Sequence, residues 1–301
     1  MIIIQSIPTI MMIVAPILIT AIGGMICERS GVVNVALEGL MSIGACSAAC
    51  VHTILETNGA GRYSILIAVL AAMAVSGLIS LVHALASIDL QADQTISGTG
   101  INLLADGVTI FACQILFSAD RSKEYKVGML IDKFGFYPTF YIAIVVVLFS
   151  WFLLYKTPFG MHLRACGEHP GAADSVGINV RRTRYIAVLL SGLLGGLSGA
   201  CIVLTQTIQF TSNLINGRGF IALAAVAFGR WTPLGVTGAA LLFGTAQALS
   251  VLSTNFPALK AFPSEIFNIV PYLVTLIALV AFSGRDYSPQ ASGKPYTKGS
   301  S

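Results

Sequence analysis

The sequence predicts an all-α integral membrane protein, a polytopic bundle of about nine transmembrane helices, within a range of about eight to ten. Three observations indicate this class: 55% of the 301 residues are apolar, only 10% are charged, and the mean hydropathy is +0.83. Soluble domains carry about 25% charged residues. Since a helix needs about 20 residues to cross a bilayer, little of the chain remains for a soluble domain.

Nine apolar runs, separated by short polar connections, are the expected crossings. The first begins at Ile2 without a basic flank or a cleavage site of small residues, which is typical of a first span and not of a signal peptide. The runs cover residues 2–25, 40–55, 65–86, 95–117, 140–155, 186–204, 220–228, 234–252 and 266–282.

The longest polar interval, residues 157–185, contains an expected short helix. Pro170 suits a first helical position, and Gly177 suits the left-handed residue that often follows a helix end. Basic residues outnumber acids here, which places the loop in the cytoplasm; they are Lys156, Arg164, Arg181, Arg182 and Arg184 against Glu168 and Asp174. The helix is either a docking element for a soluble partner or an ordinary connection.

Counting crossings from this loop organises the rest of the chain as one transmembrane domain, 1–301. Its parts are a first half, 1–155, the cytoplasmic loop, 156–185, a second half, 186–282, and a polar tail, 283–301. The count places the N-terminus outside and the tail in the cytoplasm.

Two glycine-interrupted apolar segments, 24–39 and 216–229, occupy similar places in these halves. They predict two related halves, and in transporters such broken segments often line a substrate path. The alternative is that the glycines only let helices pack closely. The small-residue spacings of Gly192 with Gly196 and of Gly195 with Gly199 are assigned to helix packing.

Two polar stripes are expected within the membrane. Ser30, Asn34 and Glu38 recur every four residues and would share one face of a helix. The second stripe lies on the fourth span and consists of Gln91, Thr95, Thr99, Asn102 and Asp106.

Asp106 would lie about three turns inside the membrane, where a carboxylate is costly unless it faces water or a partner. One explanation is a hydrated pathway for a polar, uncharged solute. The other is a structural pair of Asp106 with Arg29 or Arg218.

Other functional classes find little support in the sequence. The four histidines do not cluster, no catalytic or nucleotide-binding motif is present, and the six cysteines show no metal-ligand spacing. We therefore expect no catalytic residues, no metal and no cofactor bound by this chain. The net charge of +4 is dispersed over loops, so no nucleic-acid partner is expected.

Three long motifs carry a family resemblance. ERSGVVNVALEGLMSIGA (28–45), RACGEHPGAADSVGINV (164–180) and NGRGFIALAAVAFGRWTPLGV (216–236) resemble the permease subunits of bacterial ABC importers in the branched-chain amino acid and ribose permease superfamily. The likeness covers essentially the whole chain. It is nearest to the nucleoside importers, whose relatives include riboflavin uptake permeases.

The resemblance implies half of an importer in the bacterial inner membrane. Its expected partners are ABC ATPase subunits, which bind ATP and Mg²⁺, a second and similar permease chain, and a substrate-binding lipoprotein or periplasmic protein. The loop would contact the ATPase through a coupling helix, with contact residues Gly167, Glu168, His169, Pro170, Ala173 and Asp174. His169 stands where relatives commonly carry Asn, which predicts a weaker helix cap. The expected pathway residues are Ser30, Asn34, Glu38, Thr99, Asn102, Asp106 and Arg218.

Three alternatives stay open. A simple-sugar permease fits the same resemblance. A secondary transporter or channel without an ATPase fits Asp106 and Glu38 as proton-coupling carboxylates, and a membrane scaffold fits polar stripes that are filled by neighbouring helices. The sequence does not identify the solute or the second permease chain.

Overall fold

The computed structural model describes residues 2–132, 135–253 and 287–297, with seven further positions between 269 and 280. In these residues the chain forms helices and no strand. The elements are α1 (Ile2–Glu28), α2 (Leu37–Thr57), α3 (Tyr63–Ala84), the π-helix η1 (Leu85–Asp89), α4 (Gln94–Phe117), α5 (Pro138–Lys156), α6 (Pro158–Glu168), α7 (Pro170–Ser175), α8 (Val180–Gln206), α9 (Arg218–Phe228) and α10 (Pro233–Ser253).

Seven of the described helices are long and apolar enough to cross a membrane, so the chain is a multi-pass membrane protein. One expected crossing is wrong: the run 220–228 belongs to α9, whose 11 residues span only about 16 Å, roughly half of the hydrocarbon core. Another expected crossing, 266–282, lies outside the described residues apart from a few positions.

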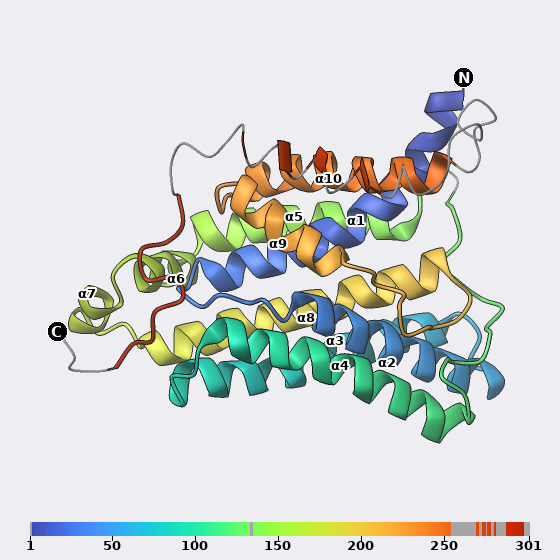
Figure 1. Cartoon of the computed structure of the whole chain (residues 1–301), viewed down its shortest axis with the longest axis horizontal. Coiled ribbons are helices and arrows are strands. Elements are labelled where there is room, and N and C mark those ends of the chain that lie inside the picture. Colours follow the sequence, from blue (N-terminus) through green and yellow to red (C-terminus); the bar gives the residue numbers. More distant parts are fainter. Residues whose placement is uncertain are drawn as a thin grey trace.

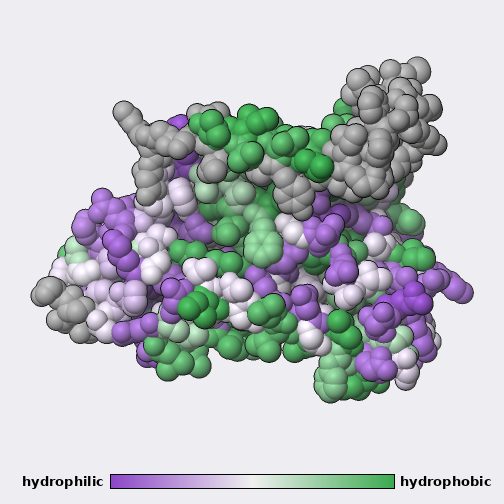
Figure 2. Space-filling view, viewed as in Figure 1, coloured by the Kyte–Doolittle hydropathy of each residue, from purple (hydrophilic) through white to green (hydrophobic). Residues whose placement is uncertain are grey.

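The helices form a bundle with α1, α2 and α8 at its centre (Figure 1). These three are mostly buried, whereas only 22–33% of the residues in the spans of α3, α4, α5 and α10 are buried. On α4 the exposed residues include Leu103, Leu104 and Phe111, which suit a lipid or protein-covered surface. Figure 2 shows apolar side chains along the bundle and more hydrophilic ones toward its two ends. We call the end with α6 and α7 the α7 end.

The predicted packing role of the glycines in α8 is confirmed. A Cβ on Gly196 would lie 2.3 Å from the Ala72 carbonyl oxygen on α3, and one on Gly199 would lie 2.1 Å from the Met41 carbonyl oxygen on α2. These distances leave no room for a side chain, so α8 contacts both neighbours through its backbone.

Replacing Gly199 with alanine is expected to destabilise the chain by about 1–3 kcal/mol, because the new methyl group overlaps the α2 backbone. Thermal unfolding of the purified chain in detergent measures the loss. Gly238→Ala on α10 is the matched control, since no atom of the described residues lies within 4 Å of its added Cβ. Equal unfolding temperatures for the two variants would contradict the close contact of α2 and α8.

Within the two broken segments, helices α2 and α9 both begin near the middle of the bundle and not at its ends (Figure 1). After α1 ends at the α7 end, the chain returns as an irregular segment to the start of α2. After α8 ends at the opposite end, residues 207–217 return to the start of α9. The first turns of α2 and α9 therefore meet inside the bundle and point in opposite directions.

Candidate functional site

Glu38 joins the first turns of α2 and α9. One of its carboxylate oxygens accepts a hydrogen bond from the Gly217 amide at 2.7 Å, and the other accepts one from the Gly219 amide at 2.6 Å. Gly217 has a φ of +81°, and a Cβ on Gly219 would lie 2.4 Å from the Glu38 amide nitrogen, so both positions favour glycine. Since Glu38 also lies in the first turn of α2, its charge faces the positive ends of both helices.

Arg218 brings an opposite charge to this junction. It is the first residue of α9 and interacts electrostatically with Glu38. Its Nε and Nη1 atoms are buried and form no hydrogen bond with the residues that the structure describes. Buried guanidinium groups are normally hydrogen-bonded, so these two unpaired donors make Arg218 a candidate binding residue.

The expected helical stripe of Ser30, Asn34 and Glu38 is wrong in its geometry. Residues 29–36 are irregular, so these three side chains do not share a helix face. Ser30 is fully buried and donates its hydroxyl to the Cys27 carbonyl at 2.6 Å. Of the three, only Glu38 reaches the junction.

Asparagine side chains hold the irregular segment in place. The Asn102 amide group of α4 accepts from the Gly39 amide at 2.8 Å and donates to the Val35 carbonyl at 3.0 Å. Asn34 is fully buried and donates to the Ser191 hydroxyl of α8 at 2.8 Å. Asn102 thus satisfies backbone groups that a helix would otherwise pair, and Asn34 fastens the segment to α8.

The second stripe is largely exposed on α4. Gln91 lies before the helix, whereas Thr95, Thr99 and Asp106 lie on it with exposed side chains. Asp106 is within electrostatic reach of Glu38 and lies at the midpoint of α4. Because a carboxylate in lipid at this depth costs roughly 2.5–3.5 kcal/mol, this face requires water or another chain beside it.

At the α7 end, the local predictions for the short helix are confirmed. Pro170 is the first residue of α7, and Gly177 follows the helix with a φ of +87°. His169 occupies the N-cap position but forms no side-chain capping bond, as expected for a weaker cap than Asn.

The six residues predicted to contact a partner divide into two groups. Glu168 and His169 are exposed, and Pro170 and Asp174 are partly exposed. Gly167 and Ala173 are buried within the chain and cannot form an outer surface. Val176 was not among the predicted residues, although its side chain is 74% exposed beside α7. Its position as an apolar residue within the polar interval 157–185 was the sequence signal that could have identified it.

Arg29 connects this loop to the rest of the bundle. Its guanidinium donates to the Trp231 carbonyl at 2.8 Å and lies 3.9 Å from the Glu168 carboxylate. The Trp231 indole donates in turn to Glu28 at 2.5 Å. Burial lowers the pKa of Arg29, and nearby Glu168 opposes that shift. Arg29 is therefore committed to the α7 end and does not form the predicted alternative pair with Asp106.

Residues 287–297, which we call the C-terminal strap, lie against the same loop. The Ala291 amide donates to the Gly167 carbonyl at 2.9 Å, and the Gly293 amide donates to the Gly31 carbonyl at 3.2 Å. Tyr296 packs on the apolar side of α7 and donates a hydrogen bond to Asp174. Desolvation and this bond raise the pKa of Tyr296.

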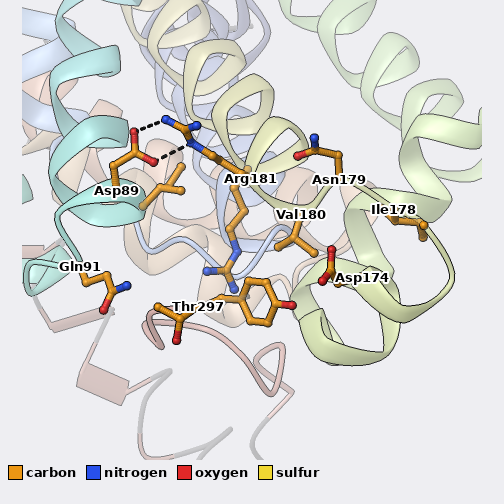
Figure 3. Close-up of a pocket in the computed structure, with 12 residues that line it drawn as sticks. Asp89, Gln91, Asp174, Ile178, Asn179, Val180, Arg181 and Thr297 are labelled. Atoms are coloured by element: carbon orange, nitrogen blue, oxygen red, sulfur yellow. Dashed lines mark hydrogen bonds and ion pairs between the residues drawn. The ribbon is translucent and has the colours of Figure 1, made fainter. Parts of the chain in front are cut away.

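A pocket of about 570 Å³ lies between η1, the α7–α8 connection and the strap (Figure 3). Two of its charged residues, Arg181 and Asp89, are paired with each other. Arg181 of α8 donates to both oxygens of Asp89 at 2.7 Å, and the Tyr185 hydroxyl donates to Asp89 at 2.6 Å. These contacts with Asp89 hold the start of α8 against η1.

Replacing Tyr296 with alanine is expected to speed hydrogen exchange in α7 about tenfold, because the helix loses one hydrogen bond and its apolar cover. Hydrogen–deuterium exchange with mass spectrometry measures the change. Tyr287→Ala is the matched control, because Tyr287 contacts Arg230 and not α7. The Arg230 guanidinium carbon lies 4.5 Å from the centre of the Tyr287 ring. Unchanged exchange in both variants would refute a stabilising role for the strap.

Comparison with known proteins identifies the family. The branched-chain amino acid transport system / permease component family matches residues 6–279. The chain is 44% identical to the guanosine ABC transporter permease protein NupQ of Bacillus subtilis, covering 97% of this chain and 96% of NupQ. It is 38% identical to the nucleoside ABC transporter permease protein NupC of Lactococcus lactis, covering 94% and 93%. It is 24% identical to the guanosine ABC transporter permease protein NupP of Bacillus subtilis, covering 90% and 80%. The chain belongs to the branched-chain amino acid transport permease family.

Proposed function

We propose that this chain is the membrane-spanning permease subunit of an ATP-driven ABC importer that takes up nucleosides. The observation that carries the proposal is the 44% identity to a guanosine permease over 97% of the chain. A nucleoside permease at 38% identity supports the same solute class. Riboflavin and simple sugars are the alternative solutes.

The importer requires a second permease chain beside this one. The exposed polar face of α4, with Asp106 at its midpoint, supports a protein-covered or hydrated surface there. This chain is 44% identical to one guanosine permease protein of Bacillus subtilis, NupQ, and 24% identical to another, NupP. We therefore place it in a heterodimer with a chain of the NupP type.

The solute pathway runs along the junction of α2, α4 and α9. Glu38, Arg218, Asp106 and Thr99 supply its polar groups, and the orphan guanidinium donors of Arg218 suit the carbonyl or ring-nitrogen acceptors of a nucleobase. The irregular segment is held in place by hydrogen bonds of Ser30, Asn34 and Asn102. The meeting of α2 and α9 in opposite directions suits two inverted, related halves.

Helix α7 is the coupling helix, and it docks on a separate ABC ATPase that holds ATP and Mg²⁺. Glu168, His169 and Val176 form the contact surface. A chain of contacts leads inward from α7: Glu168 pairs with Arg29, and Arg29 bonds to Trp231, which follows α9. Helix α9 in turn begins at the Glu38 junction. A shift of α7 would thus reach the pathway through packed and hydrogen-bonded groups.

The permease performs no covalent chemistry. It lies in the bacterial inner membrane with its N-terminus outside and with α7 and the C-terminal strap in the cytoplasm. A substrate-binding lipoprotein or periplasmic protein delivers the solute to the opposite end of the bundle.

Uptake in cells that lack this chain tests the proposal. Deletion is expected to lower the uptake of labelled guanosine at least tenfold, and expression of the wild-type chain is expected to restore it. Uptake of labelled riboflavin and ribose measured in parallel distinguishes the alternative solutes. Unchanged guanosine uptake together with lost riboflavin or ribose uptake would overturn the nucleoside assignment.

A further inference from the structure

Three cysteines that are distant in the sequence meet between α2 and α4. The Cys46 sulfur lies 3.9 Å from the Cys50 sulfur and 3.9 Å from the Cys113 sulfur, and all three sulfurs lie within 4.8 Å of one another. All three residues are buried and none forms a disulfide. We call this group the thiol cluster.

The spacing of the thiol cluster matches that of a metal site. Sulfur binds Zn²⁺ at about 2.3 Å, which requires sulfur atoms about 3.8 Å apart in tetrahedral geometry and about 4.0 Å apart in trigonal geometry. Two of the three separations, at 3.9 Å, lie between these values. The third separation joins the Cys50 and Cys113 sulfurs and is at most 4.8 Å. A small rotation of either side chain would shorten it to the same range.

The ligand set selects the kind of ion. Among the described residues, the group contains three cysteines and no histidine, aspartate or glutamate. Thiolates favour thiophilic ions such as Cu⁺ and Zn²⁺ over Mg²⁺ and Ca²⁺, which prefer oxygen. Each cysteine that binds releases its thiol proton, so the ion replaces protons as it enters.

We propose that the thiol cluster binds one thiophilic cation, Cu⁺ or Zn²⁺, and thereby joins α2 to α4. On α2 the cluster begins at the middle of the helix and extends toward the end remote from the α7 end. The segment between α4 and α5 contacts this part of α2: the His52 ring nitrogen Nε2 lies 2.6 Å from the Val127 carbonyl oxygen. The two helices joined there are those that carry Glu38 and Asp106.

Cadmium titration of the purified full-length chain, with the subunits that copurify, tests this site. Cadmium–thiolate bonds absorb in the ultraviolet, so binding is read directly. We expect one Cd²⁺ per chain and at least tenfold weaker binding in Cys46→Ser and in Cys113→Ser. Cys201→Ser is the matched control, because Cys201 is fully buried on α8 and outside the cluster; it should bind like wild type.

Competition by Cu⁺ and by Zn²⁺ against bound cadmium then distinguishes the two ions, and displacement by either supports the site. The unfolding temperature of each variant checks that the serine substitutions leave the fold intact. No cadmium–thiolate absorbance in the wild-type chain would overturn the proposal. Equal binding by wild type and by folded Cys46→Ser or Cys113→Ser would also overturn it, since the ion would then lie elsewhere.

Discussion

Replacing Glu38 with alanine is expected to abolish solute uptake and to destabilise the chain by about 3–5 kcal/mol. The carboxylate accepts hydrogen bonds from the amides of Gly217 and Gly219 and is the acid that acts electrostatically on Arg218. Its removal leaves two amides and a buried guanidinium without an anion. Uptake of labelled guanosine and thermal unfolding of the purified chain measure the two effects.

Glu38→Gln removes the charge of the side chain and keeps nearly the same shape, so it separates the effects of the two. The glutamine oxygen can accept one of the two amides, so this variant is expected to fold with a smaller loss of stability and at least tenfold slower uptake. Glu124→Ala, in an exposed position between α4 and α5, is the control for loss of a carboxylate. Wild-type uptake and stability in Glu38→Ala would remove the junction from the pathway.

A charge at the tip of the α7 loop is expected to release the ATPase. Val176 is 74% exposed, so Val176→Asp should leave the fold unchanged while a carboxylate enters an apolar contact. We expect at least tenfold less ATPase to copurify with the variant and a comparable loss of uptake. Quantitative mass spectrometry of the complex purified through a tag on this chain measures the association.

Leu130→Asp is the matched control for this tip variant. Leu130 is 69% exposed in the segment between α4 and α5, away from the α7 end, and the same change there should retain the ATPase. Wild-type amounts of ATPase on Val176→Asp would exclude Val176 from the docking surface.

Local signals in the sequence predicted the parts of the fold that depend on neighbouring residues. Hydropathy identified the long spans, because a bilayer imposes a length and a composition on every crossing helix. Pro170 and Gly177 predicted α7, since both residues restrict or permit specific backbone angles. The glycines of α8 predicted close packing, because a residue without a side chain lets the backbones of two helices approach each other.

Long-range contacts explain the failures. Ser30, Asn34 and Glu38 have helical spacing, yet residues 29–36 are irregular because Asn102 and other distant side chains satisfy their backbone groups. The i, i+4 spacing of Cys46 and Cys50 was visible, but Cys113 joins them only through the packing of α4 on α2. Neither the pairing of Glu38 with α9 nor the strap on α7 has a local sequence signal.

ATP-dependent uptake by the isolated complex tests the central claim most directly. The complex purified through a tag on this chain, reconstituted with its binding protein in liposomes, is expected to contain an ATPase and a second permease. It should accumulate labelled guanosine only when ATP is supplied on the ATPase side. Uptake by this chain alone without ATP, or uptake that collapses when a proton uncoupler is added, would contradict the account and support a secondary transporter.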